Sequence, residues 1–542
     1  MSHLNTKNWN WVTQLLPVLL AAVAVLLGAS AYAAVPGITG VSHTPSFSLT
    51  ASEDFITQPD GQMVYSWGYG CTSRPSDFRP TLAGQTCPLM QIPGPTLIVT
   101  EGDNVTVTLT NSLPPGAGNT SILFPGFQVI ASAVDTTLIG PKAGLLTTEA
   151  APGGTVTYSF TATTPGTHAY YSGTQSDLQI EMGLYGALIV LPNAPVPVGV
   201  GGCTKNNGDT ASYSLSTSAY DNLPASCYDR EYLFQLAEMD PRIHRQAEEQ
   251  VQAAKAAVAG GGTASPLNVA TEPYHPNYFL VNGRSMPDDM DANFAPPYPH
   301  QPYNGNPHMH PGDQVLLRVI GVGRWQHPFH EHGNHVRILA RDGNLLLSQT
   351  DSKKLAGPLL FTTTTTPGLA MDGIFYWSGR GLNWDVYGHK PGDGSACSPD
   401  LSGYYTAASP IPAALPGNFS QGLSTLGAPN YYEWCADHNK ALETYPVGNV
   451  GSGGPVTLPD PLILTNGLWY GGTPYLGPVA TLNAGGSTPV APGKATQNPN
   501  AGFAFMWHSH NEREITTNDV FPGGMMMMMI VDAPYVQIDE TL

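Results

Sequence analysis

The stretch PGPTLIVTEGDNVTVTLTN, residues 93–111, decides the fold class. Its second half places Val105, Val107 and Leu109 at every other position, between threonine and asparagine. That alternation is the period of a β-strand with one buried face. GTVTYSFTATTPGTHAYYSG (154–173) and GLYGALIVLP (183–192) continue the pattern to about Pro195. Strands at this spacing with Gly and Pro turns predict a β-sandwich or barrel.

A second copy of this pattern lies further along the chain. NPHMHPGDQVLLRVIG, residues 306–321, also runs from proline through Gly-Asp into alternating apolar residues. The sequence therefore predicts an all-β protein with two tandem Greek-key β-sandwich domains. The predicted layout is a signal peptide, a first domain, a linker with one strand and one helix, and a second domain that carries a long insertion at about 345–500. The signal peptide is expected at 1–34, the first domain at 35–195, the linker at 196–270 and the second domain at 271–542.

Two details of this layout depend on local signals. PRIHRQAEEQVQAAKAAV, residues 241–258, reads as a helix, because Pro241 suits its first turn and Gly260 to Gly262 follow its end. The insertion is too long to be one structureless loop. An alternative is a three-domain protein in which part of residues 345–500 forms its own module.

Composition excludes some classes of partner. The 542 residues carry 60 Gly and 50 Pro but only 11% charged residues, a balance typical of many short strands joined by turns. The net charge of −19 argues against nucleic acid and against electrostatic binding to an anionic membrane. We therefore expect no nucleic-acid partner, and no membrane partner once the signal is cleaved. The sequence is compatible with a homo-oligomer or a hetero-oligomer.

The N-terminus resembles an export signal. Lys7 precedes an apolar run from Leu15 to Ala29, and the small residues of ASAYAA predict cleavage after Ala33 or Ala34. The run is short for a spanning helix, although an uncleaved anchor is the alternative. The predicted location is periplasmic or extracellular.

Six cysteines in an exported chain suggest disulfides. They fall into three groups that are local in sequence, and none lies beside a histidine cluster. The simplest prediction is pairing within each group, with a structural role. The groups are Cys71 with Cys87, Cys203 with Cys227, and Cys397 with Cys435.

Histidines supply the strongest chemical signal. HPFHEHGNH, residues 327–335, holds four of the sixteen histidines, and WHSH, residues 507–510, holds two more. Alternate residues of a strand share a face, so His330 and His332 point the same way, and so do His508 and His510. A single His-x-His pair is more often solvated or hydrogen-bonded than bound to a metal ion. Two pairs on neighbouring strands favour a metal site, and imidazole suits copper, zinc, nickel or iron.

The chain resembles the multicopper oxidases, the cupredoxin-repeat family that includes laccases, and most closely a bacterial manganese-oxidase-like branch. The resemblance rests on PGPTLIVTEGDNVTVTLTN and GLYGALIV in the first domain and on HPFHEHG and WHSHNEREITTNDVFPGGM in the second. It implies cupredoxin-like domains, copper as cofactor, and a metal-ion or small-molecule electron donor. The implied metal ligands are His327, His330, His332, His508 and His510. No catalytic residue is assigned.

Six departures from the family pattern change what the resemblance implies. The first-domain ligand positions correspond to Leu123, Pro125, Tyr171 and Gly173. In the mononuclear blue-copper site, the resemblance places His327 at one ligand, Ser509 at the cysteine and Glu514 at the second histidine. Blue copper requires a soft thiolate, which serine cannot supply. We therefore expect a histidine-only copper site and no blue-copper relay.

Neighbouring residues add alternatives. Glu331, Glu512 and Glu514 are candidate ligands, imidazole-orienting partners or surface charges, and His308, His310 and His335 could extend the site. The Met525–Met529 run offers thioether ligands for Cu(I), although a buried terminal strand is the favoured interpretation. The functional hypotheses are an altered copper oxidoreductase, a copper storage or resistance protein, and a structural or partner subunit that combines with another chain.

Overall fold

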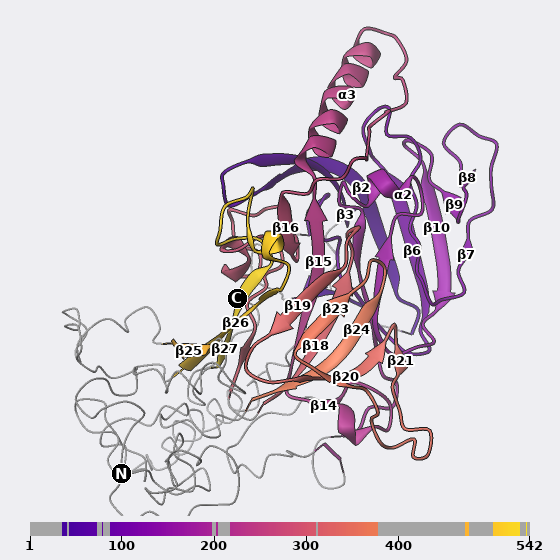
Figure 1. Ribbon diagram of the computed structural model, residues 1–542. Coiled ribbons are helices and arrows are strands. Elements are labelled where there is room, and N and C mark those ends of the chain that lie inside the picture. Colours follow the sequence, from indigo (N-terminus) through magenta and orange to yellow (C-terminus); the bar gives the residue numbers. More distant parts are fainter. Residues whose placement is uncertain are drawn as a thin grey trace, which may run out of the picture. The chain divides into compact units, whose positions relative to one another are not determined.

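The computed structural model describes residues 35–40, 43–72, 78–79, 87–197, 202–203, 217–310, 313–377, 472–475, 502–531 and 538. The predicted signal peptide, most of the predicted insertion and the pair Cys397 and Cys435 lie outside these residues. Within them the chain is almost entirely β-structure, which confirms the predicted all-β class (Figure 1). No helix in the described part of the chain is long and apolar enough to cross a bilayer.

The first β-sandwich is built from two five-stranded sheets. One runs in the order β11 (Gly166–Tyr171), β12 (Tyr185–Leu191), β5 (Leu97–Thr100), β1 (Gly37–Thr39), β4 (Phe78–Arg79). The other runs β3 (Met63–Cys71), β2 (Ser46–Thr57), β6 (Asn104–Asn111), β10 (Thr155–Thr161), β7 (Ile130–Ala131). Smaller elements are β8 (Lys142–Ala143), β9 (Thr148–Glu149) and α2 (Ser176–Gln179).

The stretch 93–111 passes from one sheet to the other. β5 pairs in parallel with β1 and β12, whereas β6 pairs with β2 and β10 in the opposite sheet. Val105, Val107 and Leu109 of β6 are all buried, and the residues between them are more exposed, as the alternation predicts. They share one core with Leu97 and Val99 of β5, so this single stretch joins the two layers.

The second β-sandwich has the same two-layer plan. One sheet runs β16 (Tyr278–Val281), β15 (Arg230–Met239), β18 (Gln314–Gly321), β24 (Ala370–Tyr376), β20 (Val336–Arg341), β21 (Asn344–Leu345), with β22 (Leu359–Leu360) beside β20. The other runs β17 (His308–Met309), β27 (Met526–Val531), β26 (Gly502–Ser509), β19 (His327–Glu331), β23 (Thr362–Thr365), with β25 (Gly472–Tyr475) beside β26. Small elements are β13 (Thr217–Ser218), β14 (Cys227–Tyr228) and the 3₁₀ turns η1 (Pro224–Ser226), η2 (Asp288–Met290) and η6 (Glu512–Ile515).

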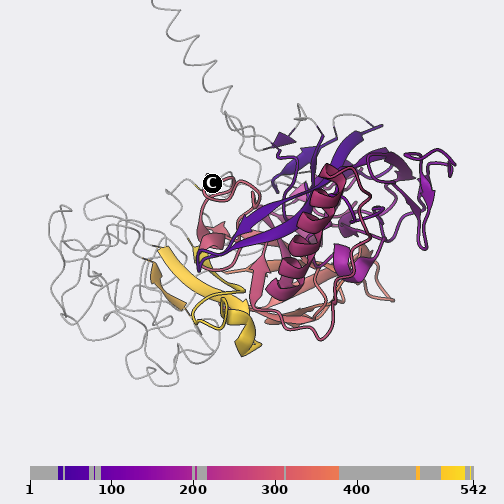
Figure 2. The same ribbon diagram turned by 90° about the horizontal axis from the view of Figure 1, so that it is seen from above.

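The segment that the sequence assigns to a linker divides between the two sandwiches. β15 lies between β16 and β18 in the second sandwich, so this strand belongs to that sheet. The predicted helix is α3 (Pro241–Ala259), and the Asp240 side chain caps it by accepting from Arg242 N–H at 2.9 Å. Its buried face packs into the core of the first sandwich, and Figure 2 shows α3 lying over that part of the chain.

A buried polar network joins the two sandwiches. Thr167 of β11 donates its backbone N–H and its hydroxyl to Asp372 of β24, at 3.0 and 2.5 Å. Arg318 of β18 lies within 3.4 Å of the same carboxylate and pairs with Glu231 at 2.8 Å. The Tyr220 hydroxyl also donates to Asp372, at 2.5 Å. The carboxylate is therefore fully partnered although it is buried, as a buried charge requires.

Two of the predicted disulfides are confirmed. Cys71 bonds Cys87, and Cys203 bonds Cys227. Both lie away from the histidine motifs in sequence and close loops of 16 and 24 residues. They constrain the unfolded chain rather than hold a metal.

Replacing Asp372 tests the joint between the sandwiches. Asp372→Asn leaves Arg318 and Glu231 in place but removes the charge and turns one acceptor into a donor facing Thr167. We expect the free energy of unfolding to fall by about 3–5 kcal/mol, the usual cost of breaking a buried pair. Urea denaturation measures it. The control is Asp351→Asn, whose pair with Lys354 is exposed and should contribute little; equal effects of the two changes would contradict the assignment.

Candidate metal centre

The register between β19 and β26 decides where every histidine of the two motifs lies. In this antiparallel pair His330 stands opposite His508, Phe329 opposite Ser509, and Glu331 opposite Trp507. Residues that stand opposite each other share a face of the sheet, and the faces alternate along each strand. His330 and His508 therefore occupy one face, here called the imidazole face. Ser509 lies on the other face, which packs into the core.

The imidazole face gathers four of the five predicted ligands. The ring of His330 lies 4.3 Å from that of His332, 5.8 Å from that of His508 and 4.6 Å from that of His510, measured between centroids. The rings of His508 and His510 are 5.0 Å apart. Two motifs separated by about 180 residues thus meet in one cluster, as the sequence predicts.

One nitrogen pair in this cluster has the geometry of two ligands of one ion. His332 Nε2 and His508 Nε2 lie 3.1 Å apart. Two nitrogens that each stand about 2.0 Å from a shared ion are separated by roughly 2.8–3.4 Å. His508 Nδ1 lies 2.8 Å from the carbonyl oxygen of Ser509 and donates its N–H there. That hydrogen bond leaves the lone pair of the neutral ring on Nε2, the nitrogen that faces His332.

The surroundings favour the neutral form of two of these rings, His330 and His508. Burial, with the nearby rings of His332, His510 and His508, lowers the pKa of His330 to about 3. Burial also lowers the pKa of His508. Copper binds imidazole only through a free lone pair, so rings that resist protonation are suited to the task.

The donor set therefore fits copper in chemistry and, at one pair of nitrogens, in geometry. The full ligand set is not already assembled: across the described residues, no group of three or more His, Cys, Asp or Glu side chains is arranged to hold a metal ion. His330 Nδ1 is engaged with the hydroxyl of Thr362 at 2.8 Å. Binding by His330 or His510 would require their rings to turn toward the His332–His508 pair.

His327 lies on the core face, apart from the other four predicted ligands. It is completely buried, with Nδ1 2.9 Å from Glu514 Oε2 and Nε2 2.9 Å from Glu238 Oε2. Burial opposes a charge here, but the hydrogen bonds to the two carboxylates outweigh it and raise the pKa of His327 to about 9. A doubly donating imidazolium has no lone pair to give a metal. His327 is held here as a buried cation between two carboxylates and would have to lose a proton to bind a metal, so its expected role as a ligand stays a prediction.

The serine of the motif belongs to this clamp. Ser509 Oγ donates to Glu514 Oε2 at 2.5 Å, and Asn511 Nδ2 donates to Glu514 Oε1 at 2.8 Å. The structure thus brings together His327, Ser509 and Glu514, the three residues that the resemblance places at a blue-copper site. What joins them is a set of hydrogen bonds.

Sequence reasoning missed the other half of the clamp. Glu238 of β15 accepts from the backbone N–H groups of Arg324 and Trp325 at 2.5 and 2.9 Å, and from the Tyr274 hydroxyl at 3.3 Å. A side chain at Gly323 would collide with this carboxylate, so the close approach requires glycine. The available signal was an acidic residue at an otherwise apolar position of the predicted strand EYLFQLAEMD.

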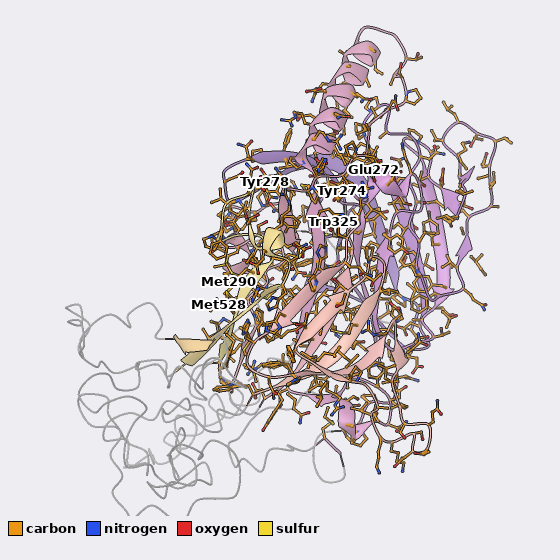
Figure 3. The ribbon with its side chains drawn as sticks, in the orientation of Figure 1. Glu272, Tyr274, Tyr278, Met290, Trp325 and Met528 are labelled. Carbon is orange, nitrogen blue, oxygen red and sulfur yellow. A yellow bond between two sulfur atoms is a disulfide. The ribbon has the colours of Figure 1, made fainter. Side chains whose placement is uncertain are left out.

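The hydrogen bonds continue from Glu238 into the first sandwich. The Tyr274 hydroxyl also donates to Glu181 at 2.7 Å, and burial raises the pKa of Glu181 to about 8. Arg324 lies over the Tyr274 ring, 4.2 Å from its centroid, and Trp325 packs edge-on against the same ring. Figure 3 shows Tyr274 and Trp325 side by side.

The remaining sequence candidates lie outside the cluster. Glu331 is on the core face, where it accepts from Thr363 at 2.6 Å and burial raises its pKa to about 8. His310 Nδ1 contacts Arg230 at 3.3 Å, His335 is exposed with its ring 5.0 Å from Phe361, and Glu512 is exposed. His308 lies on β17, where its backbone carbonyl accepts from Tyr232.

The first sandwich offers apolar groups at the positions where the resemblance predicts lost ligands. Leu123 and Tyr171 form a short antiparallel bridge, with N–O distances of 2.8 and 3.3 Å. A Cβ at Gly173 would lie 2.8 Å from Leu123 Cγ, so the leucine fills that space. A pocket of about 410 Å³ beside Leu123 and Pro125 has Thr147 as its one hydroxyl-bearing lining residue.

Comparison with known proteins supports the multicopper oxidase resemblance in this first sandwich. Residues 90–195 match the family model described as multicopper oxidase. The L-ascorbate oxidase of Brassica rapa subsp. pekinensis is 36% identical over 100 residues, which are 18% of this chain and 16% of that enzyme. The match thus spans about a sixth of the relative's length.

Two solved structures show weak similarity over a longer range. The multicopper oxidase mgLAC has a TM-score of 0.43 at 16% identity, covering 91% of this chain and 87% of its own. A blue copper oxidase from Nitrosomonas europaea has a TM-score of 0.43 at 16% identity, covering 89% and 85%. The similarity to multicopper oxidases rests on the family-model match over residues 90–195 and on the 36% identical relative. The manganese-oxidase-like branch and the loss of copper motifs stay predictions.

The clamp predicts a specific pH dependence of stability. The pKa of His327 in the folded protein, about 9, exceeds the 6.5 of an unperturbed histidine. Its stabilisation is therefore complete below about pH 6.5 and is lost as the pH rises through about 9. Glu514→Gln removes one of the two carboxylates, so the decline in stability across this range should become shallower.

This expectation is tested by measuring urea unfolding midpoints from about pH 6 to about pH 9.5, a range that spans the unfolded and folded pKa values of His327. The control is Glu512→Gln, an exposed residue of the same turn, which should follow the unchanged protein. Parallel pH profiles for all three proteins would contradict an imidazolium at His327.

Proposed function

We propose that this chain is an exported copper-binding protein, similar to multicopper oxidases, with a histidine-only copper site and no blue-copper centre. The proposed ligands are His330, His332, His508 and His510. The observation that carries the proposal is the approach of His332 Nε2 to within 3.1 Å of His508 Nε2, with the second nitrogen of His508 tied to a carbonyl.

Oxidoreductase chemistry is the activity that we propose for this site. Bound copper would supply a one-electron redox couple, and the donor would be a metal ion or a phenol-like molecule. The chain's own residues favour neutral rings at His330 and His508 and orient His508 through its Nδ1–H. Ser509, held by Glu514, offers no thiolate through which electrons could pass to the cluster.

Export is the proposed setting. The signal-like N-terminus supports it, and so do the two disulfides, because such bonds persist in oxidising compartments.

Copper storage or resistance is the second candidate. It is favoured by the same clamp: without a thiolate relay, the imidazole face can bind an ion without passing electrons onward. Assays of oxygen consumption with phenols and with Mn(II) separate the two candidates. Turnover above that of a His330→Ala variant supports the oxidoreductase, and copper binding without turnover supports the carrier.

The imidazole face makes a direct prediction for metal content. Cu(II) should bind the purified protein under aerobic conditions, and His332→Ala combined with His508→Ala should reduce bound Cu(II) to trace amounts, measured by plasma mass spectrometry after dialysis. His335→Ala, an exposed histidine outside the cluster, is the matched control and should keep full occupancy. Unchanged copper in the double variant would show that the site lies elsewhere.

The clamp makes a second prediction, for colour. Copper-loaded protein should lack the intense visible band of thiolate-bound Cu(II), because Ser509 cannot supply a thiolate. Ser509→Cys together with Glu514→His restores a cysteine and a second histidine beside His327, and also removes the carboxylate that holds the imidazolium. This variant should gain the band on loading with copper. A band in the unchanged protein would contradict the proposed absence of a blue-copper centre.

A further inference from the structure

The run Met525–Met529 separates into two faces when it folds as β27. Met525, Met527 and Met529 are buried in the core of the second sandwich, and Met527 and Met529 lie on the predicted terminal strand, which begins at Met526. Met526 and Met528 point to the imidazole face, because Met526 stands opposite His508 and Met528 opposite Met506. Core methionines substitute for leucine and valine. Met526 and Met528 on the imidazole face need a different explanation, because the outer face of an antiparallel sheet is usually polar.

The hydrogen bonds show that the outward pairs approach closely. Ser509 N–H donates to the Met525 carbonyl at 3.0 Å, so residues 509, 507 and 505 form the hydrogen-bonded pairs with β27. Met506 with Met528 is then a non-hydrogen-bonded pair, the kind whose Cα atoms are about 4.5 Å apart and whose side chains are closest.

A third methionine, packed against the core of the second sandwich, reaches the edge of β27 from another element. Met290, at the end of η2, places its sulfur 3.2 Å from the backbone nitrogen of Met528. The Met528 N–H therefore points away from β26, as expected for a residue of a non-hydrogen-bonded pair. Met290, Met506 and Met528 are all half-buried, so each keeps part of its surface accessible. Figure 3 shows Met290 and Met528 next to each other at this edge of the sheet.

We propose that Met290, Met506 and Met528 form a Cu(I)-binding thioether site at the β27 edge of the imidazole face, adjoining the histidine cluster, with Met290 reaching it from the edge of the sheet. Thioether sulfur is a soft ligand that selects Cu(I), whereas imidazole also accepts Cu(II). Met526, buried opposite His508, lies between the two groups. The face would thus present soft ligands for a cuprous ion beside borderline ligands, and the thioether site needs neither His330 nor His510.

The test measures Cu(I) rather than Cu(II). Anaerobic titration against a chromophoric Cu(I) chelator is carried out in a His332→Ala/His508→Ala background, which lacks the nitrogen pair of the proposed histidine site, so that failure of that site cannot affect the result. Adding Met290→Leu, Met506→Leu and Met528→Leu should weaken Cu(I) binding by more than about 100-fold, because loss of ligands exceeds the roughly 10–100-fold cost of outer-shell changes. Leucine nearly conserves volume, and circular dichroism verifies the fold.

The matched control is Met63→Leu, a 57% exposed methionine on β3 of the first sandwich, which should leave Cu(I) affinity unchanged. X-ray absorption at the copper edge of the Cu(I)-loaded His332→Ala/His508→Ala protein gives a readout that does not depend on the methionine variants. Sulfur scattering supports the proposal. Equal Cu(I) affinity with and without the three methionines, or scattering from nitrogen and oxygen alone, would overturn it.

Discussion

The pairing register of β19 with β26 is the constraint on which the rest of the second sandwich depends. By setting His330 opposite His508, it places four imidazoles on one face and Ser509 on the other. A slip of one residue would exchange the two faces, sending the imidazoles into the core and the buried Phe329 and Trp507 outward. Aromatic burial on the core face therefore enforces the composition of the imidazole face.

The two faces carry opposite electrostatics. On the imidazole face, burial and mutual proximity favour neutral rings, which suits ligation. On the core face, two carboxylates hold a protonated His327, and the resulting hydrogen bonds run from Ser509 to Tyr274. Strand β19 thus contributes both a candidate ligand, His330, and a buried cation, His327, three residues apart, and only the side of the sheet distinguishes them.

Much of this organisation could be predicted from the sequence, and the reasons are local. Alternation in 93–111 gives strands, and His-x-His spacing gives a shared face, so the all-β fold and the meeting of His330 with His508 were accessible. The role of His327 was not, because it depends on Glu238, a residue of a distant strand whose approach requires Gly323. The membership of β15 in the second sandwich was missed for a similar reason. Parallel pairing with β18 is a long-range contact that no local pattern reveals.

The most direct measurement is anomalous diffraction at the copper absorption edge from crystals of the full chain soaked in a copper salt. The account predicts a copper peak on the imidazole face, bonded to Nε2 of His332 and Nε2 of His508, and none beside His327. A peak enclosed by His327, Ser509 and Glu514, or no peak on the imidazole face at full copper loading, would contradict it.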